Sequence, residues 1–90
     1  MLVLHRRIGE AVVIEDVRVT LVQVTAAYCE VAFQKLAGGR RTVATLPHHE
    51  FAQACYDTRL VFLGRVGTKA TLGIDASKEL RIVRDELREA

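Results

Sequence analysis

Apolar and polar residues alternate with a period of two along several short stretches of the chain, a pattern typical of β-strands with one buried face. The alternation is clearest from residue 17 to residue 24, where Val17, Val19 and Leu21 are separated by polar residues. Further short strands are predicted at residues 2–7, 10–14, 28–34, 42–46, 60–66, 69–74 and 79–83. The abundance of valine, isoleucine and threonine supports a mainly β protein.

Two segments depart from this alternation and predict short helices. Pro47 suits the first turn of a helix, and Phe51, Ala52 and Cys55 follow it at helical spacing, which predicts a helix over residues 48–56. The charged residues 84–90 predict a second short helix at the end of the sequence, with acidic residues in its first turn.

The length of 90 residues fits a single domain, residues 1–90. The formal net charge is only +2, so the overall charge indicates no particular partner, and any nucleic-acid site must depend on where the charges lie. No run of apolar residues reaches the roughly 18 that a membrane span needs. The first basic residues follow the apolar ones, the reverse of a secretory signal, so we expect a cytoplasmic protein whose Cys29 and Cys55 are reduced.

The sequence predicts neither an enzyme nor a metal or cofactor site. It lacks a nucleophile–base arrangement, a phosphate-binding loop and the spacing of a zinc site. His48 and His49 are adjacent and would diverge on a helix, so we interpret them as surface residues.

The two parts of the chain resemble each other and suggest a degenerate internal repeat. Laid side by side, Val31 pairs with Leu72 and His48 with Arg84. In this alignment residues 42–51 copy the last strand and the helix that follows it. Residues 25–58 are thus expected to be an insertion or a degenerate repeat segment.

Both ends of the sequence carry more specific motifs. The first ten residues read Met-Leu-Val-Leu-His-Arg-Arg-Ile-Gly-Glu, and residues 78–87 read Lys-Glu-Leu-Arg-Ile-Val-Arg-Asp-Glu-Leu. The chain resembles, in these segments and in residues 66–76, the CsrA/RsmA family of carbon storage regulators. Members typically begin Met-Leu-Ile-Leu-x-Arg-Arg-x-Gly-Glu and end Lys-Glu-Val-x-Val-x-Arg-Glu-Glu-Ile. Residues 25–58 have no counterpart in a typical member, and Ser77 replaces the usual proline.

The resemblance implies the fold of that family, a small antiparallel sheet or barrel with short helices, in which the intertwined strands of two chains form an RNA-binding homodimer. It also implies a post-transcriptional regulator that binds GGA in hairpin loops of mRNA leaders or small regulatory RNAs, and so controls translation or mRNA stability. The residues that match the family's RNA-contact positions lie on the first and last strands: Leu4, Arg6, Arg7, Leu80, Ile82 and Arg84.

Several alternatives remain open. The chain is either a homodimer or a monomer that supplies internally what the family takes from a second chain. The alternative function is a protein-interaction module that heterodimerises with, or titrates, an ordinary family member. Some family members are sequestered by a protein antagonist, FliW, and such a partner is a further possibility.

Overall fold

The computed structural model describes residues 1–87 and confirms that the chain is mainly β, with antiparallel sheets. Nine strands follow one another along these described residues, and one turn of 3₁₀-helix, η1, comes last. Their bounds are β1 (Leu2–Arg7), β2 (Ala11–Ile14), β3 (Val17–Val24), β4 (Tyr28–Lys35), β5 (Thr42–Pro47), β6 (Phe51–Gln53), β7 (Arg59–Val66), β8 (Lys69–Asp75), β9 (Ile82–Arg84) and η1 (Asp85–Leu87).

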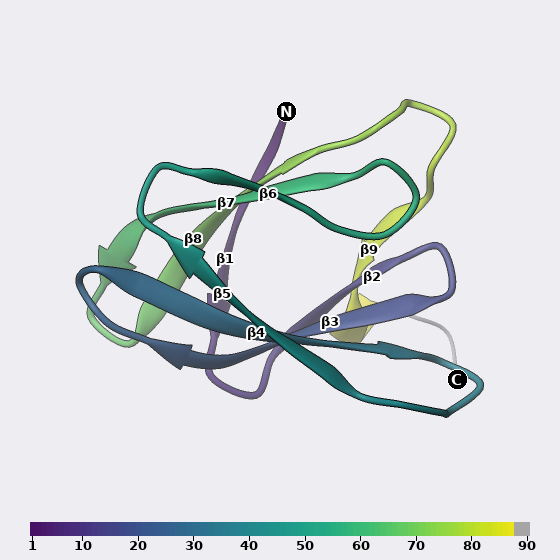
Figure 1. Ribbon diagram of the computed structural model, residues 1–90, viewed down its shortest axis with the longest axis horizontal. Helices are drawn as coiled ribbons and strands as arrows, with labels where there is room; N and C mark the ends of the chain where they lie inside the picture. Colours follow the sequence, from purple (N-terminus) through teal and green to yellow (C-terminus); the bar gives the residue numbers. More distant parts are fainter. Residues whose placement is uncertain (88–90) are drawn as a thin grey trace.

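The strands form two twisted sheets that cross each other (Figure 1). One sheet has the order β1-β8-β7-β6 and the other β5-β4-β3-β2-β9. The turn after β1 carries the chain from the first sheet to the second, and the turn after β5 carries it back. The first strand of the sequence, β1, is an edge strand of one sheet, and the last strand, β9, is an edge strand of the other.

The core lies between the two sheets, where the inward residues of the alternating strands meet. In β3 the alternation predicted from the sequence is visible, since Val17, Val19 and Leu21 are buried. The largest fully buried side chain is that of Phe62 in β7. Strands with one apolar face thus close around a shared core, as a two-layer sheet packing requires.

The helix predicted over residues 48–56 is wrong. Residues 51–53 form β6, which pairs with β7 so that Ala52 lies opposite Leu60. His49, Tyr56 and Asp57 have φ angles of 64°, 53° and 58°, which lie outside the right-handed helical region and bend the chain on either side of β6. Of the predicted C-terminal helix only η1 is described, and residues 88–90 lie outside the described part of the chain.

The two sheets are related by an internal two-fold repeat in strand pairing. Leu4 of β1 lies opposite Leu72 of β8, and Ala44 of β5 lies opposite Val31 of β4. The first half of the repeat is β1, β2, β3 and β4, and these strands are equivalent to β5, β6, β7 and β8 of the second half. The first strand of each half pairs with the last strand of the other half, since β1 pairs with β8 and β5 pairs with β4.

Backbone contacts repeat in the same way. The N–H of Gly9 donates to the carbonyl of Leu21 at 2.8 Å, and the N–H of His49 donates to the carbonyl of Phe62 at 2.9 Å. Gly9 and His49 both have positive φ angles, 92° and 64°. The strand register also shifts after Leu21 in β3 and after Phe62 in β7. Leu21 and Phe62 thus occupy equivalent positions.

The register of this repeat corrects part of the sequence alignment. Val31 and Leu72 are equivalent, as predicted. Residues 42–47, however, do not copy the last strand, since they form β5 beside β4 just as β1 lies beside β8. His48 is accordingly equivalent to Ile8 and not to Arg84. The described residues thus contain two strands of the β1 type, β1 and β5, and one of the β9 type. The sequence alignment missed this because the equivalence depends on strand partners that are far apart in sequence.

The repeat predicts the effect of a substitution at Thr58. Its side chain is fully buried and its hydroxyl has no hydrogen-bond partner in the described part of the chain, whereas the equivalent residue is Val17. Since an unpaired buried hydroxyl is unfavourable, we expect Thr58→Val to raise the free energy of unfolding by about 1 kcal/mol. Urea denaturation measures this. Thr25→Val, which removes a hydroxyl bonded to Tyr28, is expected to be destabilising, and equal effects would contradict the expectation.

Candidate nucleic-acid interface

Two edge strands, β1 and β9, flank a cavity at one side of the molecule. Its volume is about 180 Å³. Residues from both ends of the sequence line it, together with one residue of β2: Leu2, Leu4, Val12, Ile82, Val83 and Arg84. β9 is held in place by β2, since Val12 lies opposite Arg84 and Ile14 opposite Ile82. β1 is held by β8, in the other sheet.

Three of the residues predicted from the sequence meet at this cavity, namely Leu4, Ile82 and Arg84. Leu4 is buried and belongs to the core, Ile82 packs partly against the core, and Arg84 is exposed. Arg7 and Leu80 do not line the cavity. Arg7 is exposed at the end of β1, and Leu80 is half-buried in the loop before β9, where its N–H donates to the Ser77 carbonyl at 3.1 Å.

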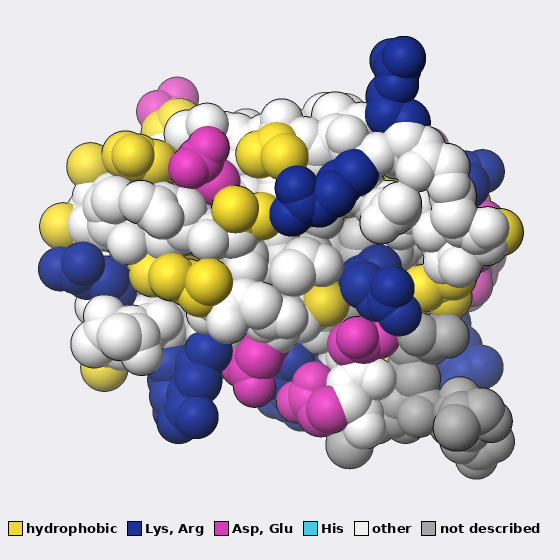
Figure 2. All heavy atoms as spheres, turned by 90° about the horizontal axis from the view of Figure 1, so that it is seen from below, with side chains coloured by type: hydrophobic (Ala, Val, Ile, Leu, Met, Phe, Trp, Pro, Cys, Tyr) yellow, Lys and Arg dark blue, Asp and Glu magenta, His cyan; other side chains and the backbone are white. Residues whose placement is uncertain are grey.

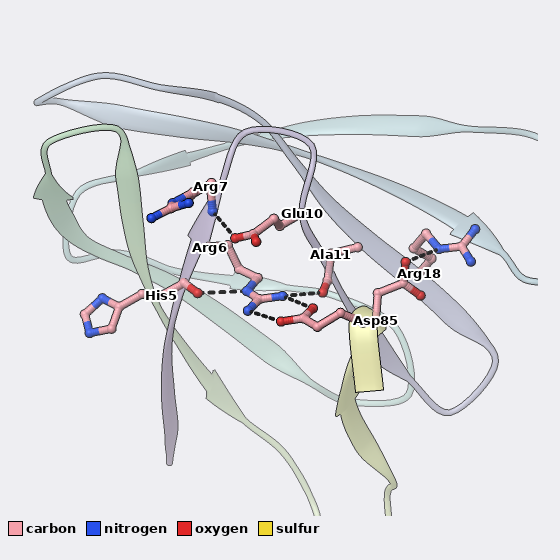
Figure 3. Close-up of polar contacts among 8 residues, drawn as sticks. His5, Arg6, Arg7, Glu10, Ala11, Arg18 and Asp85 are labelled. Atoms are coloured by element: carbon pink, nitrogen blue, oxygen red, sulfur yellow. Dashed lines mark hydrogen bonds and ion pairs between the residues drawn. The ribbon is translucent and has the colours of Figure 1, made fainter. Parts of the chain in front are cut away.

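The two arginines of β1 point to opposite sides of the strand (Figure 3), as alternation in a strand predicts. Arg7 is exposed, but Arg6 is only 5% exposed. The Arg6 guanidinium donates two hydrogen bonds to the Glu86 carboxylate, at 2.7 and 2.9 Å. It also donates to the carbonyls of His5 and Ala11, at 2.7 and 2.9 Å. Its hydrogen-bonding capacity is therefore largely used within the protein.

The Arg6–Glu86 pair ties β1 to η1, directly after β9. The hydrogen bonds and charge of Arg6 lower the pKa of the Glu86 carboxyl to about 2, and the same hydrogen bonds raise the pKa of Arg6. A second ion pair, between Arg18 Nε and Asp85 Oδ2 at 3.3 Å, ties β3 to η1. These two pairs keep the last strand and the turn after it in contact with both sheets.

Protonation of Glu86 is expected to weaken this attachment at low pH. Because its pKa in the folded protein is lower than the ordinary value of 4.5, the pair stabilises the fold above about pH 4.5. That stabilisation is lost as the pH falls toward about 2. We expect the difference in melting temperature between the natural protein and Glu86→Gln to be largest at neutral pH and to vanish in acid. A difference independent of pH would contradict this assignment.

The internal repeat indicates how Arg6 can be replaced. The residue equivalent to Arg6 is Leu46, which is 1% exposed. Leucine would fill the apolar space at position 6, but it would leave the half-exposed Glu86 carboxylate without its partner. We therefore expect Arg6→Leu and Arg6→Ala both to lower the free energy of unfolding, with the alanine variant clearly less stable because of the space it leaves. Urea denaturation of both variants measures this, and a worse result for leucine would contradict it.

The sequence did not reveal two features of this region. The pairing of Glu86 with Arg6 was missed, because the sequence pattern indicates an acidic residue in the first turn of a helix and does not show which strand faces it. The lining residues Leu2, Val12 and Val83 were missed as well. Leu2 is a large apolar side chain that is 44% exposed, a signal that appears only when burial is known.

Basic side chains do not gather in one large patch on the face drawn in Figure 2, where they alternate with acidic and apolar side chains. The small net charge of +2 agrees with this distribution. An anionic partner would therefore have to be recognised locally, at exposed residues such as Arg7 and Arg84, and not by a general positive field.

The described residues contain no group of three or more histidine, cysteine, aspartate or glutamate side chains that could hold a metal ion. They also contain no helix long and apolar enough to cross a membrane. Comparison of the chain with protein-family models, curated proteins and solved structures gave no match. The function must therefore be inferred from the geometry of the cavity between β1 and β9 and from the sequence motifs of these two strands.

Proposed function

We propose that the chain is an RNA-binding post-transcriptional regulator of the CsrA/RsmA type that acts in the cytoplasm. It would recognise GGA in hairpin loops of mRNA leaders or small regulatory RNAs. One observation carries the proposal. The two strands whose sequences resemble the family's RNA-contacting strands lie far apart in sequence, and they flank the same cavity.

The free edges of β1 and β9 and the cavity between these two strands suit an unpaired RNA loop. Both strands are edge strands in the described chain, so each has one side on which no neighbouring strand is paired with it. Bases in a loop expose their edges, which a duplex hides in its narrow major groove. An arginine can donate two parallel hydrogen bonds to a guanine edge or to a phosphate. A cavity of about 180 Å³ is small for a cofactor, and it suits the edge of one base.

The six predicted residues would then have different roles. Arg84 is exposed at the cavity and is the candidate for contacting guanine, while exposed Arg7 is a candidate for contacting phosphate. Ile82 and Leu4 form the apolar floor. Arg6, being buried against Glu86, acts as a positioning residue for β9 and does not contact RNA directly. Leu80 contributes to the loop that precedes β9.

The finer fold that we propose is a CsrA-like dimer condensed into one chain. In that family the first strand of one chain lies beside the last strand of the other. In this protein β1 and β9 approach each other within the same chain, which supports the self-complemented monomer over the homodimer. The second half has its own first strand, β5, but the described chain provides no second last strand. We therefore propose one RNA site per chain.

A fluorescence-anisotropy titration tests the function. The probe is a short RNA hairpin with GGA in its loop, and the control is the same hairpin with both guanines replaced. Tight binding that is lost in the control supports the proposal. Equal, weak and salt-sensitive binding to both hairpins would indicate contact with phosphates only and would contradict recognition of GGA.

A further inference from the structure

The second half of the repeat has an open strand position. Beside the first half, β9 pairs with β2 on the side of β2 that does not face β3. The strand equivalent to β2 is β6, which is the edge strand of its sheet in the described part of the chain. The pairing that β2 has on both sides is thus present on only one side of β6, where Ala52 lies opposite Leu60 of β7.

A second cavity marks the same position. Its volume is about 300 Å³, and its lining comes from β4, β5, β6 and the turn after β6: Phe33, Thr42, Ala44, Gln53, Ala54 and Cys55. Thr42 and Ala44 are equivalent to Leu2 and Leu4, which line the β1–β9 cavity. We call the β6 edge with this lining the β6 groove.

The β9 strand shows what the β6 groove would hold. Ile82 lies opposite Ile14 of β2 and packs against the core. The residue equivalent to Ile14 is Ala54, which lines the β6 groove and also packs against the core. A strand added to β6 in the register of β9 would therefore place one side chain over Ala54, and an apolar side chain would complete the core there.

The charges suggest what would follow the added strand. Arg18 of β3 pairs with Asp85, the residue directly after β9. Its equivalent in β7 is Arg59, whose side chain is 52% exposed. Arg59 lies over the ring of Phe51, 4.8 Å from the ring centre, and pairs with Asp75 of β8 at 2.6 Å. A carboxylate just after the added strand would share this exposed guanidinium with Asp75, at the position where Asp85 meets Arg18.

A second copy of the chain cannot fill every such position. Each copy has two strand positions, beside β2 and beside β6, but residues 1–87 supply a single β9. Exchange of β9 between copies would leave one position open in every copy. A strand from a different protein has no such restriction. We propose that the β6 groove takes up an extended strand of a different protein, with alternating apolar residues and an acidic residue directly after it.

This docking site is separate from the RNA site, and the inference does not rest on the proposed function. A synthetic peptide with the sequence of residues 78–87 serves as the probe, because it carries the β9 pattern. The readout is alkylation of Cys55 in the full chain, since its half-buried thiol lines the groove. Cys29 provides an internal reference for unfolding, because its side chain is fully buried in the folded chain and burial raises the pKa of its thiol to about 12.

We expect saturating peptide to slow alkylation of Cys55 about tenfold, since access controls thiol reactivity. A peptide in which aspartate replaces the isoleucine of position 82 should give no protection, and this control involves no change in the protein. Ala54→Arg should abolish protection, whereas Ala26→Arg, in an exposed turn, should preserve it.

Four results would overturn the inference, and three of them come from the alkylation experiment with added peptide or RNA. They are unchanged alkylation with the peptide, equal protection by the aspartate-containing peptide, and protection of Cys55 by the hairpin RNA in place of the peptide. Concentration-dependent self-association that protects Cys55 without peptide would also overturn it, in favour of a second copy. Loss of GGA binding with peptide protection intact would contradict only the proposed function.

Discussion

Arg84→Ala is expected to lower the affinity for the GGA hairpin about 10- to 100-fold, the range of a bidentate arginine contact to guanine. Arg84 is exposed at the β1–β9 cavity, and no neighbouring strand pairs with the outer side of β9 in the described chain. Its removal takes away a fork of charge-assisted donors without opening the core. The melting temperature should therefore stay almost unchanged.

A matched control separates base recognition from general charge. Arg41 is also exposed, and it precedes β5, the edge strand farthest from β9 in its sheet. Arg41→Ala removes the same charge at a position away from the proposed RNA site. The ratio of the affinity for the GGA hairpin to the affinity for its guanine-free control should therefore not change. The Arg84 assignment would be contradicted if Arg84→Ala kept the affinity of the natural protein, or if both variants reduced the ratio equally.

Phe62→Ala is expected to destabilise the fold by about 3–5 kcal/mol, as truncation of a buried aromatic residue usually does. Phe62 is 0% exposed and is the largest fully buried side chain among the described residues. Its carbonyl also accepts the N–H of His49, where the chain passes from β5 to β6. A cavity at this position would loosen the packing between the sheets. Urea denaturation followed by circular dichroism measures the change.

The internal repeat supplies the control for this substitution. Leu21 is equivalent to Phe62 and is 1% exposed, so the same position in the first half is filled by leucine. We expect Phe62→Leu to cost clearly less than Phe62→Ala, about 1–2 kcal/mol, because most of the apolar volume is retained. Equal losses for the leucine and alanine variants would show that the two halves are not packed alike around the core.

Much of the strand content could be predicted from the sequence, because alternation is a local signal. The predicted strands at 17–24, 28–34 and 60–66 correspond closely to β3 (Val17–Val24), β4 (Tyr28–Lys35) and β7 (Arg59–Val66). Each has an apolar face long enough to show the period of two. Opposite orientation of Arg6 and Arg7 followed from the same rule.

Features that depend on distant partners could not be predicted. Phe51 and Cys55 stand at helical spacing, yet pairing with β7 makes residues 51–53 a strand, and His49 adopts a positive φ that a turn requires. The burial of Arg6 depends on Glu86, eighty residues away. The repeat register also depends on which hairpin an edge strand joins, and nothing local in residues 42–47 specifies that choice.

In the proposed function, one chain forms both halves of a repeat and carries one complete RNA site. Native mass spectrometry of the chain mixed with an excess of the GGA hairpin tests this most directly, because it counts both components of the complex. We expect one chain bound to one hairpin. A complex of two chains, with one or two hairpins, would contradict the self-complemented monomer, and absence of any complex would contradict RNA binding.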